Sequence, residues 1–568
     1  MATATCESNQ NDRVAALAAG ADQLAAASAA RRAALAEACM ASTAAVADRW
    51  VQQAAAIKQA DATAAREAVL AEETGTGPLV TLRLLMITRD VWRRLAAGRL
   101  PPLPGGPKVA HQPPPGVQGD EHVERIEVDV VPWPGLYDGT VFPGTRATVR
   151  CVNTGGPGHE ANAAFMRLWR EETQRRPQSG GVAVVLGAGN VTGLSAADAI
   201  SQIFDHGRAV LLKLHPLHAP LAGVLKEALA PLVEAGLLEV VAGGPEVVAQ
   251  AVGCSRVTQV HLTGGRATYD RIRDDLAARG LDVPISCELG NVTPWFVVPG
   301  NYSDFAISRQ ADAIAGSIIN NTSFNCIATK LVVTCRGWDG REKLLAAIRQ
   351  RLDAAPRRAA WFPGSGAAYE QLTGRPLPED GCLPWTFETG LDPVADRQWL
   401  DREWFFPAVA EIPLDTASLE EFCGQALDLA RSLPGTLAAN VSMPAFRDPR
   451  EWRRAELLVE HLGFGVVSVN TWAALGYALA GVPWGGLPGG TVAEPGSGIG
   501  YVHDPLMLPL VHNTIVRAPL APTLKPAWLP WHSGGKMLTR SLIDVYTAKS
   551  MLGASWGLTK MLPAVLRG

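Results

Sequence analysis

Short apolar segments alternate with helical segments over residues 181–289, and no other feature constrains the fold as strongly. The strand-like segments are Gly181–Leu186, Ala209–Leu214, Leu237–Ala242, Gln259–Leu262 and Pro284–Leu289. Helical segments such as Leu221–Glu234 and Ala267–Arg279 lie between them. Strands and helices in this order pack as right-handed βαβ units around a parallel sheet. We therefore expect an α/β fold that contains a nucleotide-binding domain of the Rossmann type.

The regions on either side of this alternation have other patterns. Residues 13–98 are rich in alanine with apolar side chains at helical spacing, which predicts a run of helices. Prolines and glycines at 101–106 and 113–116 break this run into a loop. Arg125–Val130 and Thr145–Arg150 alternate charged and apolar residues, which is typical of half-exposed strands. Strand-like runs such as Leu331–Thr334 and Gly465–Val469 predict a second α/β lobe from Trp295 to about Asn470.

These patterns divide the chain of 568 residues into five parts. We expect N-terminal helices and a cofactor-binding domain at 1–122 and 151–290, bridging strands at 123–150, and a catalytic domain at 291–480. Residues 481–520 are expected to return to the cofactor and oligomerisation region, and residues 521–568 to form a basic amphipathic tail.

Composition excludes several classes of protein. Lys and Arg number 51 against 55 Asp and Glu, a net charge of −4 that gives no general attraction to nucleic acid. The N-terminus lacks the charged and then apolar layout of a secretory signal, so we expect a cytoplasmic protein. Gly463–Ala493 contains no charged residue, yet its prolines and glycines favour buried core over a membrane span.

The cysteines and histidines do not indicate a metal site or a disulfide framework. Nine cysteines form an odd set, and the closest two, Cys326 and Cys335, are nine residues apart. Cys254 and Cys287 are interpreted, like Cys335, as core thiols. The histidines occur in no metal-binding motif, so we expect structural roles for His206, His215, His218 and His261.

Several short motifs stand at the ends of the predicted strands or in the second lobe. Gly187–Gly193 reads GAGNVTG, a phosphate-loop pattern that is weak alone because Lys213, and no acidic residue, ends the next strand. The other motifs, in chain order, are HLTGG at 261–265, CELGN at 287–291, FNCIA at 324–328, EWFFP at 403–407 and PWGG at 483–486.

This ordered set resembles the NAD(P)-dependent aldehyde dehydrogenase superfamily, over about Ala147 to Gly500. The resemblance implies a Rossmann-type cofactor domain, an α/β catalytic domain and a bridging oligomerisation element. It implies that Cys326 is the nucleophile, because oxidation of an aldehyde by hydride loss first needs a covalent adduct with a thiolate. Asn190, with the backbone N–H of Cys326, is assigned to the oxyanion hole, and Glu288 to the general base that activates water.

The same resemblance assigns the cofactor contacts. Lys213 is expected at the adenosine ribose, and Thr263, Gly264 and Gly265 along the nicotinamide-side phosphates. Glu403 is expected at the nicotinamide ribose and Phe405 beside the nicotinamide ring. Gly187 and Gly189 then serve the geometry of the strand-to-helix turn.

Two departures from the family pattern affect these assignments. Asn325 precedes the cysteine where the family commonly has Gln, and Pro216 stands where it commonly has an acidic residue three after the lysine. A carboxylate there would bind the 2′-hydroxyl of NAD and repel the 2′-phosphate of NADP. Either NAD or NADP is therefore expected as cofactor, and the chain looks like a long, less-studied branch of the superfamily.

Three functions remain open at this stage. The first is oxidation of a small-molecule aldehyde to a carboxylate through a thioester on Cys326. The second is an acylating relative that transfers the acyl group to coenzyme A or works in reverse as an acyl-CoA reductase. The third is a non-catalytic scaffold, which would not need all of Asn190, Glu288, Cys326 and Glu403.

Two further expectations concern partners. The strands near residues 125–150 occupy the place where the family extends a ribbon between subunits, so we expect a homodimer or homotetramer. In 521–568 six Lys or Arg stand against Asp544, with Trp528, Trp531 and Trp556 among them. This tail either packs on its own or a partner subunit, or contacts the surface of an anionic membrane peripherally.

Overall fold

A computed structural model describes residues 2–62, 64–110, 125–134, 138–155, 159–548 and 550–565. Of residues 2–11, 62 and 551 it describes the backbone alone. The predicted loop at 113–116, the predicted domain boundary at 122–123, and Lys549 and Arg567 of the tail lie outside the described residues.

The N-terminal part is helical, as its alanine-rich pattern predicts. It contains α1 (Ala2–Ala25), α2 (Ala29–Ile57), α3 (Arg66–Thr74) and α4 (Val80–Ala96), with a short 3-10 turn at Ala60–Ala62. Helix α2 begins after Ser28, whose side chain accepts a hydrogen bond from the backbone N–H of Arg31. A π-helical turn at Gly75–Leu79 joins α3 to α4, and Pro78 lies inside it. This helical run packs against α18 (Gly535–Thr547) of the tail.

The alternation at 181–289 folds into a six-stranded sheet of order β17-β8-β7-β4-β5-β6, in which all pairs are parallel except β17 with β8. Its strands are β4 (Val182–Leu186), β5 (Ala209–Lys213), β6 (Leu238–Val241), β7 (Val257–Gly264), β8 (Ile285–Leu289) and β17 (Gly498–Ile499). Residues 182–185 of β4 are fully buried because helices cover both faces of the sheet. The prediction of a parallel α/β domain is confirmed.

The helices of this domain differ from the prediction at one place. They are α6 (His159–Arg175), α7 (Leu194–Phe204), α8 (Ala222–Ala228), α9 (Ala230–Glu234), α10 (Pro245–Ala251) and α11 (Arg266–Ala278), with 3-10 turns at Arg176–Gln178 and Pro216–Leu221. The helix expected over Leu221–Glu234 is divided into α8 and α9. Pro231 has no N–H for a helical hydrogen bond, so the chain leaves the helical conformation at Leu229 and starts again.

A second, ten-stranded sheet has the order β1-β2-β3-β18-β16-β15-β9-β10-β14-β13. Its strands are β1 (Lys108–Ala110), β2 (Arg125–Val131), β3 (Arg146–Val152), β9 (Pro294–Val297), β10 (Leu331–Cys335), β13 (Thr386–Glu388), β14 (Ala408–Leu414), β15 (Ala438–Ser442), β16 (Val466–Val469) and β18 (Val511–Arg517). The pairs from β18 to β13 are parallel, whereas β1, β2 and β3 join antiparallel. The second α/β lobe is therefore present.

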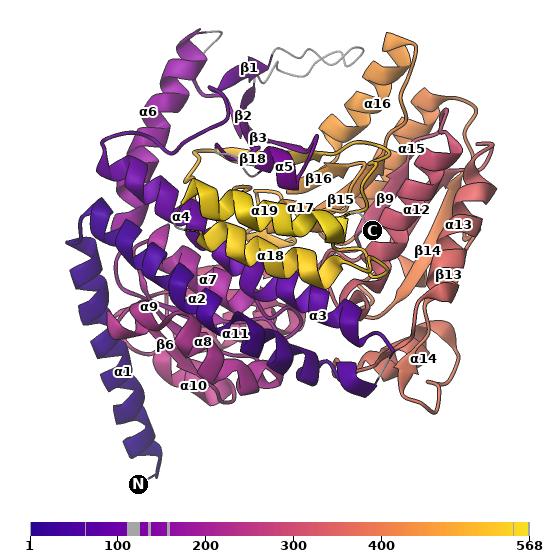
Figure 1. Cartoon of the computed structure of the whole chain (residues 1–568). Helices are drawn as coiled ribbons and strands as arrows, with labels where there is room; N and C mark the ends of the chain where they lie inside the picture. Colours follow the sequence, from indigo (N-terminus) through magenta and orange to yellow (C-terminus); the bar gives the residue numbers. More distant parts are fainter. Residues whose placement is uncertain are drawn as a thin grey trace.

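The remaining elements of this lobe cover its sheet. They are α5 (Asp138–Val141), α12 (Asp304–Ile319), α13 (Arg341–Ala354), α14 (Ser365–Thr373), α15 (Leu419–Ser432), α16 (Pro449–His461), α17 (Ala474–Ala478), a small hairpin of β11 (Arg358–Ala359) with β12 (Cys382–Leu383), and 3-10 turns at Asn320–Ser323 and Arg397–Trp399. Figure 1 shows α12, α13, α15 and α16 on the orange side of the molecule, away from the helices of the first domain.

The strands expected to bridge subunits are present as β2 and β3. They pair with each other, and β3 pairs with β18, which continues into the large sheet of the same chain through β16. Outside this ribbon, the three residues of β1 pair with Arg125–Glu127 of β2. An assembly through this ribbon stays a prediction.

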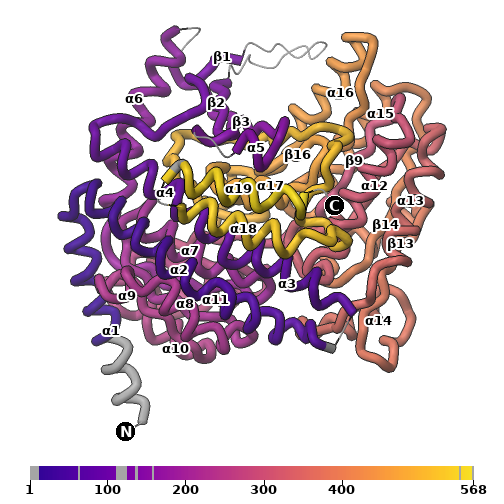
Figure 2. The backbone as a smooth tube through the Cα atoms, viewed as in Figure 1, coloured from indigo at the N-terminus to yellow at the C-terminus, as the bar shows by residue number. Residues whose placement is uncertain are grey.

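The C-terminal tail forms two helices, α18 (Gly535–Thr547) and α19 (Met551–Val565), which lie side by side over the N-terminal helices (Figures 1 and 2). Leu538, Leu542 and Ile543 of α18 are buried there. Packing on its own subunit, one of the two interpretations of the tail, is what α18 does. On α19, Leu552 and Trp556 remain exposed.

The uncharged stretch Gly463–Ala493 forms β16, α17 and turns that are mostly buried up to Gly486 and largely exposed at 488–493. Ala473, Leu479, Ala480 and Val482 are fully buried, so the prediction of core is confirmed for the part up to Gly486. Among the described residues, none of the helices is long and apolar enough to cross a membrane.

Candidate active site

The predicted catalytic residues converge where the two lobes meet. Asn190 follows β4, and Glu288 lies in β8 next to Thr263 of β7. Cys326 follows the 3-10 turn Asn320–Ser323, which extends α12. The carboxyl ends of β4, β7 and β8 thus face the loop that carries the thiol. This is the place where open parallel sheets hold ligands.

Cys326 and Glu288 are in direct contact. The thiol of Cys326 donates a hydrogen bond to Oε1 of Glu288 at 3.1 Å, and Trp484 Nε1 donates to Oε2 at 2.8 Å. Glu288 is 2% exposed, whereas Cys326 is half-buried. Trp484 therefore fixes the carboxylate so that its other oxygen faces the sulfur. The PWGG motif at 483–486 was identified from the sequence, but no role was predicted for Trp484.

Burial shifts the protonation of both groups. It raises the pKa of Glu288 to about 7. Burial, with the nearby charges of Glu288 and Glu403, raises the pKa of the Cys326 thiol well above its usual value. At neutral pH the sulfur is thus protonated, and the carboxylate beside it is poised between its two forms. A base with a pKa near the working pH is suited to take a proton and to release it again.

Asn190 lies on the other side of the thiol loop. Its side-chain Nδ2 donates to the backbone oxygen of Phe324 at 3.0 Å, which leaves its second N–H for another acceptor. Asn321 Nδ2 donates to the backbone oxygens of Asn190 and Phe324, both at 2.9 Å. The amide predicted for the oxyanion hole is therefore tied to the loop that carries Cys326.

Three consecutive residues before Cys326 have left-handed backbone conformations. The φ angles are 52° for Asn321, 56° for Thr322 and 61° for Ser323, and none of the three is glycine. Each such residue costs roughly 1 kcal/mol or more, and persists where its surroundings determine it. The loop of the thiol therefore needs support from the rest of the structure.

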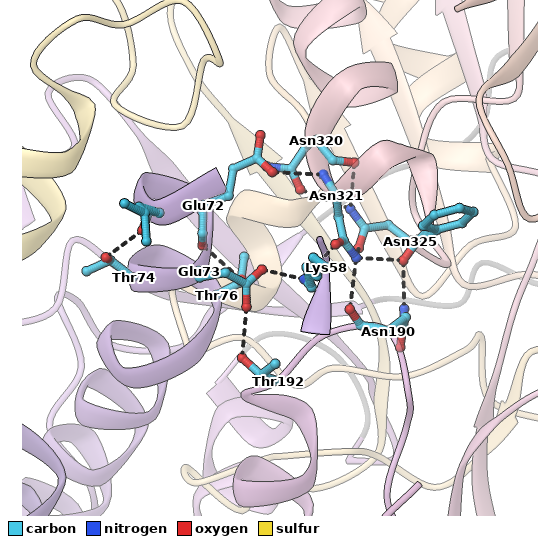
Figure 3. A network of polar contacts seen from close by, with 12 residues as sticks. Lys58, Glu72, Glu73, Thr74, Thr76, Asn190, Thr192, Asn320, Asn321 and Asn325 are labelled. Carbon is cyan, nitrogen blue, oxygen red and sulfur yellow. Dashed lines mark hydrogen bonds and ion pairs between the residues drawn. The ribbon is translucent and has the colours of Figure 1, made fainter. Parts of the chain in front are cut away.

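That support comes from the N-terminal helices, as Figure 3 shows. Lys58, which ends α2, donates to Oδ1 of Asn321 at 2.6 Å and forms an ion pair with Glu73 of α3. The other oxygen of Glu73 accepts a hydrogen bond from Thr192 at 3.1 Å, two residues after Asn190. One buried pair thus joins the thiol loop to the loop of the oxyanion amide.

Glu72 supports the same loop from the backbone side. Its Oε2 accepts a hydrogen bond from the backbone N–H of Asn321 at 3.0 Å. Arg358 donates to both of its oxygens at 2.8 Å, a paired geometry that fixes the carboxylate. Sequence reasoning missed Lys58, Glu72, Glu73 and Arg358. The two adjacent glutamates at the end of a helical segment were the only signal.

The glycines of GAGNVTG serve packing. A Cβ on Gly187 would lie 2.1 Å from the hydroxyl of Ser195, and one on Gly189 would lie 2.3 Å from the ring of His215. A Cβ on Gly193 would lie 2.3 Å from the backbone oxygen of Thr76, in the π-helical turn. These contacts allow only hydrogen at these positions and support a role in the geometry of the turn.

The residues predicted for the cofactor line the same edge of the six-stranded sheet. Lys213 ends β5, and burial lowers its pKa while the nearby Glu246 raises it. Thr263 is buried, and its hydroxyl has no hydrogen-bond partner among the described residues. Gly265 precedes α11 with no side-chain cap, and a Cβ there would meet nothing within 4 Å. An open helix N-terminus beside an unused hydroxyl fits a phosphate group.

Glu403 approaches this edge from the second lobe. A Cβ on Gly290 would lie 1.7 Å from its Oε2, so only glycine admits the carboxylate. Its Oε1 is buried and has no hydrogen-bond partner in the described part of the chain. Burial raises the pKa of Glu403 to about 8. An unused buried carboxylate fits a ribose hydroxyl, so together with Thr263 and Gly265 the site is suited to a dinucleotide.

Lys330 is a buried cation near Glu403 that sequence reasoning missed. Its ammonium donates to the backbone oxygen of Phe406 at 2.9 Å and to the hydroxyl of Ser323 at 3.0 Å. Burial lowers the pKa of Lys330 to about 7, and the charge of Glu403 opposes that shift. Lys330 thus holds Ser323, the last left-handed residue of the thiol loop, whereas Lys58 holds Asn321, the first.

Phe405 belongs to an aromatic wall. Its ring centroid lies 4.8 Å from that of Phe362 and 5.9 Å from that of Phe324. Trp361 contacts the same group, with its ring 5.0 Å from that of Phe324. Planar rings of this kind offer a surface on which a flat heterocycle can stack.

Behind Glu288 lies a group of buried polar side chains. Nδ1 of His261 forms a hydrogen bond of 2.8 Å with the hydroxyl of Ser286, and its Nε2 lies 3.5 Å from the carboxylate of Asp198. The hydroxyl of Tyr477 and both ring nitrogens of His503 have no hydrogen-bond partner among the described residues. This side of the site is therefore polar, although Trp484 supplies an aromatic face.

Comparisons with known proteins agree with this geometry. The model of the aldehyde dehydrogenase family matches residues 160–355, which include Asn190, Lys213, Glu288 and Cys326. No curated protein matches the chain.

Solved structures share the fold over most of the chain. An indole-3-acetaldehyde dehydrogenase complexed with NAD⁺ is 14% identical, with a TM-score of 0.59 over 90% of this chain and 88% of its own. An NAD-dependent aldehyde dehydrogenase from Sinorhizobium meliloti is 15% identical, with a TM-score of 0.58 over 90% and 86%. An NADP-dependent glyceraldehyde-3-phosphate dehydrogenase from Bacillus halodurans, complexed with NADP, is 16% identical, with a TM-score of 0.58 over 90% and 91%. At these identities the likeness shows the fold.

Proposed function

We propose that this chain, whose residues 160–355 match the model of the aldehyde dehydrogenase family, is a member of that superfamily and oxidises an aldehyde to a carboxylate with NAD or NADP as cofactor. The observation that carries this proposal is the hydrogen bond of 3.1 Å from the Cys326 thiol to Glu288. A thiol with a raised pKa is a poor nucleophile unless a base takes its proton, and that base is already in contact with it.

The first step is attack of Cys326 on the aldehyde carbon. A bond forms between sulfur and carbon, the thiol proton passes to Oε1 of Glu288, and the carbonyl oxygen becomes an oxyanion. The free N–H of Asn190 and the backbone N–H of Cys326 stabilise that oxygen. A bound oxidised nicotinamide would supply the acceptor for the hydride of the former aldehyde carbon, and collapse of the oxyanion would leave a thioester on Cys326.

The second half of the reaction releases the acid. Glu288 first releases the thiol proton to solvent and then takes a proton from a water molecule, whose oxygen adds to the thioester carbon. The carbon–sulfur bond then breaks, and the sulfur leaves as thiolate or takes back a proton from Glu288. Trp484, which donates to the other carboxylate oxygen at 2.8 Å, keeps Glu288 oriented through both proton transfers.

The residues around the dinucleotide site act by binding and orientation. The hydroxyl of Thr263 and the N-terminus of α11 would hold phosphate oxygens, and Glu403 would accept hydrogen bonds from a ribose. Phe405 and Phe362 would bound the plane of the nicotinamide. Lys213 lies at the end of β5, where the adenosine ribose is expected.

A burst experiment tests the proposal. Because Glu288 also takes the thiol proton in the first step, Glu288→Gln, mixed with a panel of aliphatic and aromatic aldehydes and either dinucleotide, is expected to form its first equivalent of NAD(P)H per subunit more slowly than the wild type. The steady rate that follows should be lower by roughly 10²–10⁴, the usual contribution of a general base. Cys326→Ala should give no burst while it still binds the dinucleotide, and intact-mass spectrometry should find the acyl group on Cys326 of the glutamine variant.

Coenzyme A separates hydrolysis from acyl transfer in the same assay. The proposed enzyme turns over without coenzyme A, and coenzyme A does not rescue Glu288→Gln. A wild type that stalls after one turnover until coenzyme A is added would contradict hydrolysis and identify an acylating enzyme. Wild-type protein that binds dinucleotide but forms no NAD(P)H with any aldehyde of the panel would contradict both.

A further inference from the structure

A cleft of about 340 Å³ lies far along α2 from Lys58, at the other end of that helix. The start of α2, the end of α4 and the end of α6 with the turn at Arg176–Gln178 surround it. Cationic and apolar side chains line it together, and none of the lining residues is acidic.

Arg32, in the first turn of α2, is the central residue of this cleft. Its side chain is 3% exposed, and its Nη2 donates to the backbone oxygens of Leu24 at 2.8 Å and Pro177 at 3.3 Å. Its Nη1 is buried and has no acceptor among the described residues. The guanidinium lies over the ring of Trp92, with 4.8 Å from Cζ to the ring centroid.

The charge of Arg32 has no counter-ion in the described structure. No ion pair joins Arg32 to a carboxylate among the described residues, and burial lowers its pKa to about 10, which still leaves it charged at neutral pH. A buried charge without a partner is costly, and buried charges are normally paired. The unused Nη1 therefore indicates that an anion from outside the chain completes this site.

Two more arginines raise the positive charge at the same place. Arg99, after α4, and Arg170, on α6, line the cleft and are exposed. Nearby carboxylates are bound to other arginines: Glu37 to Arg93, Asp22 to Arg256, and Glu172 to Arg175 and Arg176. The N-terminus of α2, which is 29 residues long, adds its partial positive charge.

The apolar side chains of the cleft indicate that the ligand also has an apolar part. Trp92, Leu95 and Leu100 line the cleft beside the arginines. A small inorganic ion would leave this apolar surface uncovered, whereas an organic anion would cover it. Guanidinium groups bind phosphate and carboxylate through two parallel hydrogen bonds.

We propose that this cleft is a second ligand site, which binds a small organic oxyanion, a phosphate or carboxylate group on an apolar body. Arg32 binds the oxyanion, Arg99 and Arg170 add charge at the entrance, and Trp92 contacts the apolar body. The site is distinct from the candidate active site, so the proposal does not depend on the proposed function.

Calorimetry tests the proposal with phenyl phosphate, phenylacetate, inorganic phosphate and phenol as probes. The full chain is first saturated with dinucleotide, so that the probes do not enter the cofactor site. We expect phenyl phosphate or phenylacetate to bind at one per subunit, inorganic phosphate at least tenfold more weakly, and phenol not at all. Failure of both aromatic anions to bind at millimolar concentration would overturn the proposal.

Variants locate the binding. The double variant Arg99→Ala/Arg170→Ala changes exposed residues and should lower the affinity for the aromatic anion at least tenfold. Arg167→Ala, which is also exposed on α6 but lies outside the cleft, should leave that affinity unchanged. Arg32→Met should abolish binding. Unchanged affinity in the double variant and in folded Arg32→Met would place the anion elsewhere and overturn the assignment.

A stability measurement separates binding from simple loss of structure. Because Arg32 is charged, buried and unpaired, Arg32→Met should melt at or above the wild-type temperature without ligand. It should lose the rise in melting temperature that phenyl phosphate gives the wild type. A large drop in melting temperature without ligand would show that Arg32 is a structural residue satisfied by the carbonyls of Leu24 and Pro177, and would contradict the proposal.

Discussion

Lys58 donates a hydrogen bond of 2.6 Å to Asn321, although 263 residues separate them in the sequence. Lys58 ends a helix of the N-terminal region, and Asn321 opens the left-handed run before Cys326. The buried ion pair between Lys58 and Glu73 holds this contact in place and reaches Thr192 beside the oxyanion amide. The geometry of the nucleophile therefore depends on a helix far from it in the chain.

The first prediction concerns this pair. Glu73→Gln leaves Lys58 buried with an uncompensated charge, which should lower the free energy of unfolding by about 3–5 kcal/mol. Lys58→Met/Glu73→Leu removes both charges and should be less destabilised than Glu73→Gln. Arg540→Ala, which breaks exposed pairs with Asp48 and Asp544, is the matched control and should change stability by less than about 1 kcal/mol.

The reactivity of Cys326 shows whether the Lys58–Glu73 pair positions the thiol loop or only stabilises the fold. In the double variant, measured well below its melting temperature, the loop loses the hydrogen bond from Lys58, so the first turnover should be at least tenfold slower. The rate of alkylation of Cys326 by iodoacetamide should change as well. Normal single-turnover and alkylation rates in folded double variant would mean that the pair contributes to stability alone.

The second prediction follows from the raised pKa of Glu288. As a base, Glu288 acts in its ionised form, and burial raises its pKa to about 7. Turnover should therefore fall as the pH falls through about 7 and level off above it. Single-turnover and steady-state rates between pH 5.5 and 9 check this, and a rate that is flat from pH 5.5 to 9 would exclude Glu288 as the base.

The same shift predicts a stability effect of defined sign. Because the pKa of Glu288 is raised above 4.5 in the folded state, the native protein holds this proton more tightly than the unfolded chain. Its contribution to stability is complete below about pH 4.5 and is lost as the pH rises through about 7. Relative to wild type, Glu288→Gln should therefore be more stable at pH 8 than at pH 5, as melting at the two pH values would show.

The catalytic residues could be predicted because they belong to short motifs at strand ends or turns, and the alternation of strands and helices places those motifs in the fold. Asn190, Glu288 and Cys326 were assigned in this way, and the structure brings the last two into contact. Lys58, Glu73 and Trp484 could not be assigned, because their roles arise from contacts across 263, 119 and 196 residues. Local spacing holds no information about such pairs.

The parallel direction of the strands was likewise predicted better than the interruption of a helix. The parallel order of β4 to β8 follows from alternation and handedness, which local pattern records. The break at Leu229 depends on one proline within a segment that otherwise has helical periodicity. The packing of α18 on α3 was one of two alternatives, because amphipathic patterning predicts an apolar face without naming what covers it.

The third prediction concerns the choice of cofactor. Pro216 supplies no carboxylate near Lys213, but Glu246, in the first turn of helix α10, interacts electrostatically with that lysine. A carboxylate there should disfavour a 2′-phosphate, so Glu246→Gln should raise the ratio of kcat/KM for NADP to that for NAD by about tenfold, or ~1.4 kcal/mol. Glu234→Gln, exposed at the end of α9, is the control. An unchanged ratio would show that Glu246 does not face the ribose.

The last prediction concerns assembly. In β2, Arg125–Glu127 pair with β1, whereas Val128–Val131 have no strand partner on that side among the described residues. An open strand edge is a template for another chain. A dimer, or a dimer of dimers, should therefore form through this ribbon, and light scattering should give a mass of at least twice 60.1 kDa at micromolar concentration.

Asp129→Pro removes one backbone donor from β2 and should shift the protein toward monomer, whereas Asp274→Pro, on a helix of the other domain, should not change the mass of folded protein. A wild type that stays at 60.1 kDa at micromolar concentration would contradict the assembly.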